Sequence, residues 1–140
     1  MKAFVAVLAG ATVVAAIGAI TALGGAPAQA NQNAVVRVKL GEFGITSQPR
    51  AVSAGKVTFS ALNIGEVEHE LVIIRSSKSA LPVKKFKAVE PEAGVIGEIE
   101  DVEPGKRGKL TATLSAGKYL LICNIVGHYQ LGMRTMLTVR

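Results

Sequence analysis

The sequence predicts an all-β protein, a Greek-key β-sandwich of seven to eight strands that follows an N-terminal signal peptide. Three observations support this prediction. Short apolar runs recur along residues 35–139, and several of them alternate apolar with polar residues, as strands with one buried face do. Gly- or Pro-containing turn signals separate the runs. This many short strands and turns in one domain-sized segment is typical of two packed sheets.

Residues 1–30 have the features of a secretory signal peptide. Lys2 supplies a positive start, Phe4 to Ala22 is uncharged and apolar, and Ala28-Gln29-Ala30 is a small-x-small cleavage signal. Cleavage after Ala30 would leave one domain, residues 31–140, in the periplasm or another extracytoplasmic compartment.

The alternative is an uncleaved membrane anchor. The uncharged run from Ala3 to Val36 is long enough to span a bilayer. The Ala- and Gly-rich composition and the ending Ala-Pro-Ala-Gln-Ala favour a signal peptide, so we expect no membrane span after cleavage.

Seven runs are predicted as strands. In chain order they are Val35 to Leu40, Lys56 to Leu62, Glu70 to Arg75, Val95 to Ile99, Lys109 to Leu114, Lys118 to Cys123 and Arg134 to Val139. The stretch from Ser79 to Val89 is predicted instead as a short helix, with Ser79 as its cap, Pro82 in its first turn, and Val83 and Phe86 facing inward.

The most specific pattern lies near the C-terminus, where Cys123, His128 and Met133 are spaced as Cys-x4-His-x4-Met. The chain has only two histidines, and the other, His69, begins a strand-like run behind the turn Asn63-Ile64-Gly65. Thiolate and thioether favour Cu(I), whereas imidazole serves both Cu(I) and Cu(II). Two His, one Cys and a weak axial Met are therefore the ligands of a blue-copper electron-transfer centre.

Each of these residues also has a structural interpretation. A lone Cys usually packs as a small apolar side chain, and a Met beside a strand is usually core. In an exported chain, however, a single Cys that has no second Cys for a disulfide is a liability in an oxidising compartment, which favours a role such as metal binding. Met136 is the competitor for the axial position, but it lies within the last predicted strand, where packing is the more natural role.

These residues make the chain similar to the cupredoxins, the superfamily of type 1 copper proteins that includes plastocyanin, azurin, auracyanin and sulfocyanin. The resemblance covers about Val35 to Arg140, and its specific part is Asn63-x-Gly65-x-x-x-His69 with the downstream Cys-x4-His-x4-Met. It implies one copper ion, with His69, Cys123 and His128 in a trigonal plane and Met133 axial. It also implies electron exit through His128.

One position departs from the family pattern. Glu70 stands where many members have an Asn that ties the two ligand loops together. We expect the backbone N–H of Glu70 to reach the Cys123 sulfur, and Asn124 to supply the side-chain tie. We also expect the ring edge of His128, flanked by Gly127, Tyr129, Leu131 and Gly132, to reach a small apolar surface.

The charges are segregated along the chain, whose formal net charge is +6, or +5 once Lys2 is removed. Residues 71–89 hold five basic and no acidic residues, whereas residues 90–103 hold six acidic and no basic ones. These are either solvated loops or a dipolar surface that orients redox partner proteins.

With six Tyr and Phe residues and no basic stripe interleaved with aromatics, the sequence does not favour nucleic-acid binding. We expect a monomer.

Three function classes fit these residues to different degrees. The first is a one-electron carrier that is not an enzyme. The second is a copper-binding protein for storage or delivery, which would favour the His-rich or Met-rich tracts that this sequence lacks. The third is a Cys-His enzyme with Cys123 as nucleophile and His128 as base, which leaves His69 and Met133 unexplained.

Overall fold

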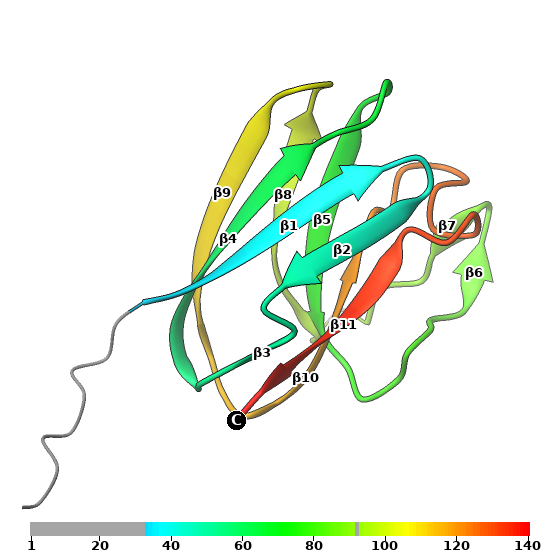
Figure 1. Ribbon diagram of the computed structural model, residues 1–140. Helices are drawn as coiled ribbons and strands as arrows, with labels where there is room; N and C mark the ends of the chain where they lie inside the picture. The colour runs from blue at the N-terminus through cyan, green and yellow to red at the C-terminus, as the bar shows by residue number, and fades with distance from the viewer. Residues whose placement is uncertain (1–32, 92) are drawn as a thin grey trace, which may run out of the picture.

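A computed structural model describes residues 33–91 and 93–140 as two packed β-sheets and a small hairpin (Figure 1). The predicted signal peptide, residues 1–30, lies outside the described residues. Within the part of the chain that is described, no helix has the length and apolarity needed to cross a membrane.

The strands of the first sheet follow the spatial order β2-β1-β4-β9, and those of the second follow β3-β11-β10-β5-β8. Their bounds are β1 Ala34–Gly41, β2 Gly44–Gln48, β3 Ala51–Val52, β4 Gly55–Asn63, β5 His69–Arg75, β8 Val95–Val102, β9 Arg107–Leu114, β10 Gly117–Ile122 and β11 Arg134–Val139. Eight of these strands have five or more residues, so the predicted all-β sandwich of seven to eight strands is confirmed.

The alternation seen in the sequence becomes the division between core and surface. In β1, Val36, Val38 and Leu40 are buried, and Arg37 and Lys39 between them are exposed. Side chains of both sheets meet in one apolar core, which extends to Cys123 and Met133 at one end of the sandwich. The core therefore reaches the predicted ligand residues.

The predicted helix from Ser79 to Val89 is wrong. This segment contains a short antiparallel hairpin, β6 (Val83–Lys84) and β7 (Lys87–Ala88), and its two turn residues, Lys85 and Phe86, both have positive φ. The extended backbone is held by tertiary contacts, because the Ala88 N–H donates to the Asn124 Oδ1 at 2.6 Å and the Asn124 Nδ2 donates back to the Ala88 carbonyl at 3.1 Å. Val83 and Phe86, expected inside, are exposed.

The β10–β11 loop lies at the end of the sandwich opposite the C-terminus, next to the β6–β7 hairpin (Figure 1). Strand β10 is hydrogen-bonded to β11 on one side and to β5 on the other. This arrangement brings the start of β5 beside the end of β10, and therefore His69 beside Cys123.

Candidate metal centre

Rigid strand ends position three of the four predicted ligands. Cys123 directly follows β10, Met133 directly precedes β11, and His69 is the first residue of β5. His128 lies midway along the loop that joins β10 to β11. Three of the four side chains thus come from one loop, and the fourth comes from the adjacent strand.

The loop is closed by its own backbone hydrogen bonds. The Cys123 N–H donates to the Met133 carbonyl at 3.1 Å, and the Met133 N–H donates to the His128 carbonyl at 3.2 Å. The His128 N–H donates in turn to the Ile125 carbonyl at 3.0 Å. These bonds link Cys123, His128 and Met133 to one another through the main chain, so their relative positions do not depend on side-chain packing alone.

Three donor atoms converge. The Nδ1 atoms of His69 and His128 are 3.2 Å apart. The Cys123 Sγ lies 3.5 Å from the Nδ1 of His128 and 3.9 Å from the Nδ1 of His69. Met133 joins the same end of the core as Cys123 and is fully buried.

These separations fit three ligands of one transition-metal ion. Metal–nitrogen bonds of about 2.0 Å and metal–sulfur bonds of about 2.3 Å, set at about 105–130° to each other, place the two nitrogens about 3.2–3.6 Å apart and sulfur about 3.4–3.9 Å from each nitrogen. The three separations above fall within those ranges. A soft set of thiolate, two imidazoles and a nearby thioether suits copper better than a hard cation, which requires oxygen ligands.

The cluster is shielded from solvent everywhere except at His128. His69, Cys123 and Met133 have no exposed surface, whereas His128 is partly exposed. The loop around His128 carries Val126 and Leu131, 62% and 59% exposed, and the ring of Phe43 meets the His128 ring edge-on with centroids 5.3 Å apart. The predicted apolar surface at His128 is present, although Tyr129 is buried and does not belong to it.

His69 is held from behind by a carboxylate. Its Nε2, the ring nitrogen that faces away from the cluster, lies 2.9 Å from the Oε1 of Glu42 in the turn between β1 and β2. The backbone N–H groups of Val67 and Glu66 donate to the same carboxylate and lower the pKa of Glu42. The β1–β2 turn therefore contacts both histidines, through Glu42 and Phe43.

A second carboxylate lies beside the cysteine. Burial raises the pKa of the Cys123 thiol, and the nearby backbone N–H groups of Glu70 and Ile125 partly offset that rise. The hydrogen bond expected from the Glu70 N–H to the sulfur stays a prediction. The Glu70 carboxylate accepts a bond of 2.9 Å from the Asn124 N–H, and burial raises the pKa of Glu70. The tie between the two ligand loops therefore comes from the Glu70 side chain.

The prediction that Asn124 supplies that tie is wrong. Its side chain points to the β6–β7 segment instead, where it bonds to both main-chain groups of Ala88 and to the Glu90 carboxylate. The physical reason is reach: the Glu70 side chain already spans the gap between the loops, which leaves Asn124 free to hold the hairpin.

In the metal-free protein the cluster favours uncharged forms. Burial raises the pKa of the Cys123 thiol, and burial together with the neighbouring His69 lowers the pKa of His128. A bound cation would reverse the effect on the thiol, because metal coordination requires the thiolate. Metal binding would therefore release a proton from Cys123.

The β6–β7 hairpin brings positive charge next to the ligand loop. The Gly127 N–H donates to the Phe86 carbonyl at 2.8 Å, and the Leu81 N–H donates to the Tyr129 hydroxyl at 2.6 Å. The hairpin carries three exposed lysines, Lys84, Lys85 and Lys87. A basic surface thus borders the apolar surface around His128.

Sequence reasoning missed Glu42 and Phe43. They occupy a short turn after a predicted strand, which in sequence has no feature that distinguishes it from any other hairpin turn. Only the pairing of β1 with both β2 and β4 places this turn over the β4–β5 loop and the ligand loop. The signal that could have found Glu42 was weak: it is the acidic residue nearest in sequence before the turn at Asn63.

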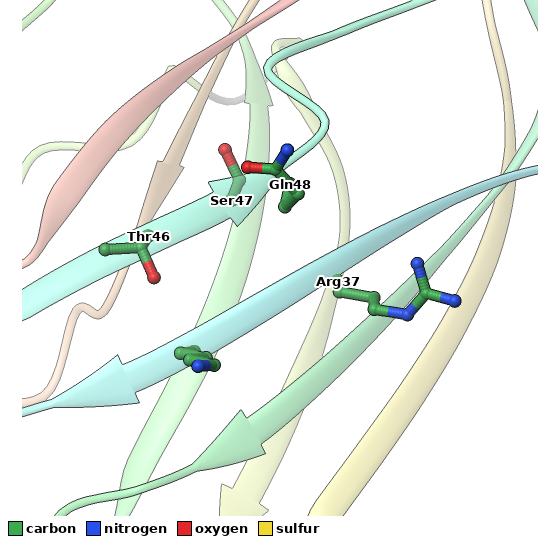
Figure 2. A pocket seen from close by; sticks show the side chains of 5 residues that line it. Arg37, Thr46, Ser47 and Gln48 are labelled. Carbon is green, nitrogen blue, oxygen red and sulfur yellow. The ribbon is translucent and has the colours of Figure 1, made fainter.

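A surface pocket lies elsewhere, on strands β1 and β2. Figure 2 shows Arg37 on β1 and Thr46, Ser47 and Gln48 on β2, which line it together with Lys39. Among the described residues, this pocket contains neither a nucleophile next to a base nor a set of metal-ligating side chains. The His-Cys-His cluster remains the candidate functional site.

Comparison with known proteins gives matches only at the level of three-dimensional structure. No protein-family model matches the chain, and no curated protein sequence matches it. Auracyanin A, a "blue" copper protein from the green thermophilic photosynthetic bacterium Chloroflexus aurantiacus, superimposes with a TM-score of 0.59 at 23% identity, over 78% of this chain and all of that one.

Two further structures give the same result. Dithionite-reduced auracyanin from Roseiflexus castenholzii matches with a TM-score of 0.58 at 18% identity, over 79% of this chain and 99% of that one. Rusticyanin from Thiobacillus ferrooxidans matches with a TM-score of 0.62 at 14% identity, over 79% of each chain. These structures are cupredoxins, so the predicted cupredoxin-like fold is confirmed.

Proposed function

We propose that this protein is an exported one-electron carrier that holds one copper ion in a type 1 site and cycles it between Cu(II) and Cu(I). The observation that carries the proposal is the convergence of two imidazole nitrogens and one thiol sulfur, 3.2–3.9 Å apart, at the buried end of a cupredoxin-like sandwich. His69, Cys123 and His128 are the proposed trigonal ligands, and Met133 is the proposed axial one.

Copper supplies the reversible one-electron couple, and the chain supplies a site that changes little between the two oxidation states. His69 starts a strand, Cys123 ends one, and Met133 precedes another, so the scaffold resists rearrangement. His128 is the only one of the four with exposed surface. An electron would therefore leave or enter through its ring edge, at the apolar surface that Leu131 and Val126 help to form.

The basic hairpin suggests how a partner is selected. Lys84, Lys85 and Lys87 flank the apolar surface, and long-range attraction would guide a redox partner with an acidic docking face toward His128. Reversing charge at Lys84 and Lys85 should then change the salt dependence of that reaction without changing the absorption spectrum. Cleavage of residues 1–30 would place the domain in an extracytoplasmic compartment, where we expect it to act as a monomer.

The two alternative classes fit the geometry less well. A storage or delivery protein must exchange its metal with another protein, which favours exposed ligands, whereas three of these four side chains are fully buried. A Cys-His enzyme needs an accessible thiol of lowered pKa, whereas Cys123 is buried and its pKa is raised. Both observations favour the electron carrier.

The direct test is the visible spectrum of the purified protein after addition of Cu(II), together with voltammetry. We expect an intense thiolate-to-Cu(II) absorption and a reversible one-electron wave. Cys123→Ser should remove the absorption and leave at most a weakly bound, colourless ion. A coloured Ser variant, or a wild-type protein that takes up copper without colour, would contradict the proposal.

The axial assignment has its own test. Met133→Gln replaces a soft thioether with a harder oxygen, so it should lower the reduction potential while the colour persists. Met136→Gln is the matched control, because Met136 packs against the second apolar cluster, on the other face of the sheet. If voltammetry shows the larger shift for the Met136 variant, the assignment of Met133 is wrong.

A further inference from the structure

We infer that Glu42 is a positioning residue for the copper site, one that fixes the tautomer of His69 and lowers the reduction potential through its negative charge. This inference rests on the proposed function, because it concerns the same ligand. It concerns a contact between the β1–β2 turn and the back of a ligand ring, rather than a further ligand.

The first step is the orientation of the imidazole. The His69 Nδ1 faces the Nδ1 of His128 and the Cys123 sulfur, so it must offer a lone pair if it binds the ion. The proton of the neutral ring then resides on Nε2, which lies 2.9 Å from the Glu42 Oε1. A carboxylate can only accept here, so the contact selects the tautomer that binds metal.

The second step is that the carboxylate is itself held in place. The Glu66 N–H lies 3.0 and 3.1 Å from its two oxygens, and the Val67 N–H lies 3.1 Å from Oε1. The Cα of Gly65 packs against the carboxylate so closely that a Cβ there would overlap it. The Glu42 carboxylate is thus held in place by backbone N–H groups of the β4–β5 loop, although the residue as a whole is exposed.

The third step is electrostatic. The His69 side chain has no exposed surface, and that of Glu42 is 28% exposed, so water screens the contact only in part. A full negative charge on a hydrogen-bonded partner makes the imidazole a stronger donor and favours the more positive metal ion. Glu42 should therefore stabilise Cu(II) relative to Cu(I), and a neutral partner in the same place would do so less.

The decisive variant is Glu42→Gln, since its amide oxygen can still accept from the His69 N–H while the charge is removed. Glu68→Gln is the matched control, because Glu68 is an exposed acid next to His69 in sequence that makes no bond to the ring. We expect Glu42→Gln to keep the visible absorption and to weaken Cu(II) binding by about 10-fold or more, within the range known for partners of metal-bound His. If Cu(I) binding is unchanged, each tenfold loss raises the potential by about 59 mV.

Two further variants test the geometry. Gly65→Ala should displace the carboxylate and shift the potential in the same direction, although it leaves every acidic residue in place. Glu42→Leu removes the hydrogen bond as well, so it should also expose the His69 Nε2 proton, which in the wild-type Cu(I) protein we expect to see by NMR as a slowly exchanging signal. The NMR signal of the Nε2 proton reports the tautomer of His69, and the reduction potential reports the negative charge of Glu42. A general loss of stability would not raise the potential or change the exchange of that proton specifically.

The outcomes separate the two proposals. If the wild-type protein shows no thiolate-to-Cu(II) absorption, the proposed function fails. If it does, but Glu42→Gln leaves the potential and the Cu(II) affinity equal to those of Glu68→Gln, the role of Glu42 is wrong and the copper site stands. A lowered potential in Glu42→Gln would also overturn the inference.

Discussion

The two histidines of the cluster are chemically identical and are set in opposite surroundings. His69 is fully buried, begins a strand, and has both ring nitrogens engaged, one by the cluster and one by Glu42. His128 lies in a loop, is partly exposed, and has an aromatic ring, that of Phe43, against its edge. The difference separates two tasks: one ligand anchors the site to the sandwich, and the other opens it to partners.

This division follows from the sheet topology. The strand that begins with His69 lies between β8 and β10 and cannot move without breaking two strand pairings. The loop that carries His128 is restrained by its own hydrogen bonds and by the β6–β7 hairpin. Substitutions at or near His69 and substitutions at or near His128 should therefore affect different properties of the protein.

The largest expected effect concerns the stability of the metal-free protein. His69→Ala should lower the free energy of unfolding by about 2–4 kcal/mol, because it leaves a cavity and removes the ring that pairs with Glu42. His128→Ala should cost about 1 kcal/mol or less, since part of that ring is already in water. Urea denaturation of the two variants measures both values; equal losses would mean that His69 is not the anchor.

The next effect concerns electron exchange between two copies of the protein. Leu131→Lys places a charge in the apolar surface at His128, and two such charges would meet when the surfaces dock. Self-exchange should slow by about tenfold or more, equivalent to about 1.4 kcal/mol, while the spectrum stays the same. Val35→Lys, which adds the same charge to an exposed apolar position on β1, is the control. An unchanged rate in Leu131→Lys at moderate ionic strength would rule out exit through His128.

The smallest effect is the response of the metal-free protein to acid. Burial and the neighbouring His69 lower the pKa of His128 below 6.5 in the folded state, so the unfolded chain binds more protons in that range. Stability should therefore fall as the pH drops through about 6.5. The decrease should be modest, because water screens a partly exposed ring. His128→Gln should show a shallower slope between pH 7 and 5; an identical slope would assign the acid response to other groups.

The fold and three of the four proposed ligands could be predicted from local patterns in the sequence, whereas His69 was proposed because it is the only other histidine of the chain. Short apolar runs, several of them alternating with polar residues, identified seven of the eight longer strands. They missed only β2, a short strand with the weakly apolar sequence Gly-Ile-Thr-Ser-Gln. The spacing of Cys123, His128 and Met133 placed three side chains on one loop. The structure brings the donor atoms of His69, Cys123 and His128 within 4.8 Å of one another and places Met133 in the same apolar core as Cys123.

The surroundings of the site could not be predicted, because they depend on contacts between distant segments. Glu42 reaches His69 across 27 positions, and the Glu70 carboxylate reaches the Asn124 N–H across 54. The segment from Ser79 to Val89 has a plausible helix start, but its bonds to Asn124 and Tyr129 override that local preference. Neither kind of contact leaves a periodic signal in the sequence.

The hydrogen bonds that close the ligand loop on itself also bear on how the metal is acquired. The main-chain bonds that link Cys123, His128 and Met133 use none of the proposed metal-binding atoms. They restrain the loop independently of the metal, so little chain entropy remains to be lost on loading. Metal would then act by mass action on a finished fold, raising the melting temperature with the logarithm of free copper concentration. A newly made chain could fold first and bind copper afterwards, so folding would not require the ion.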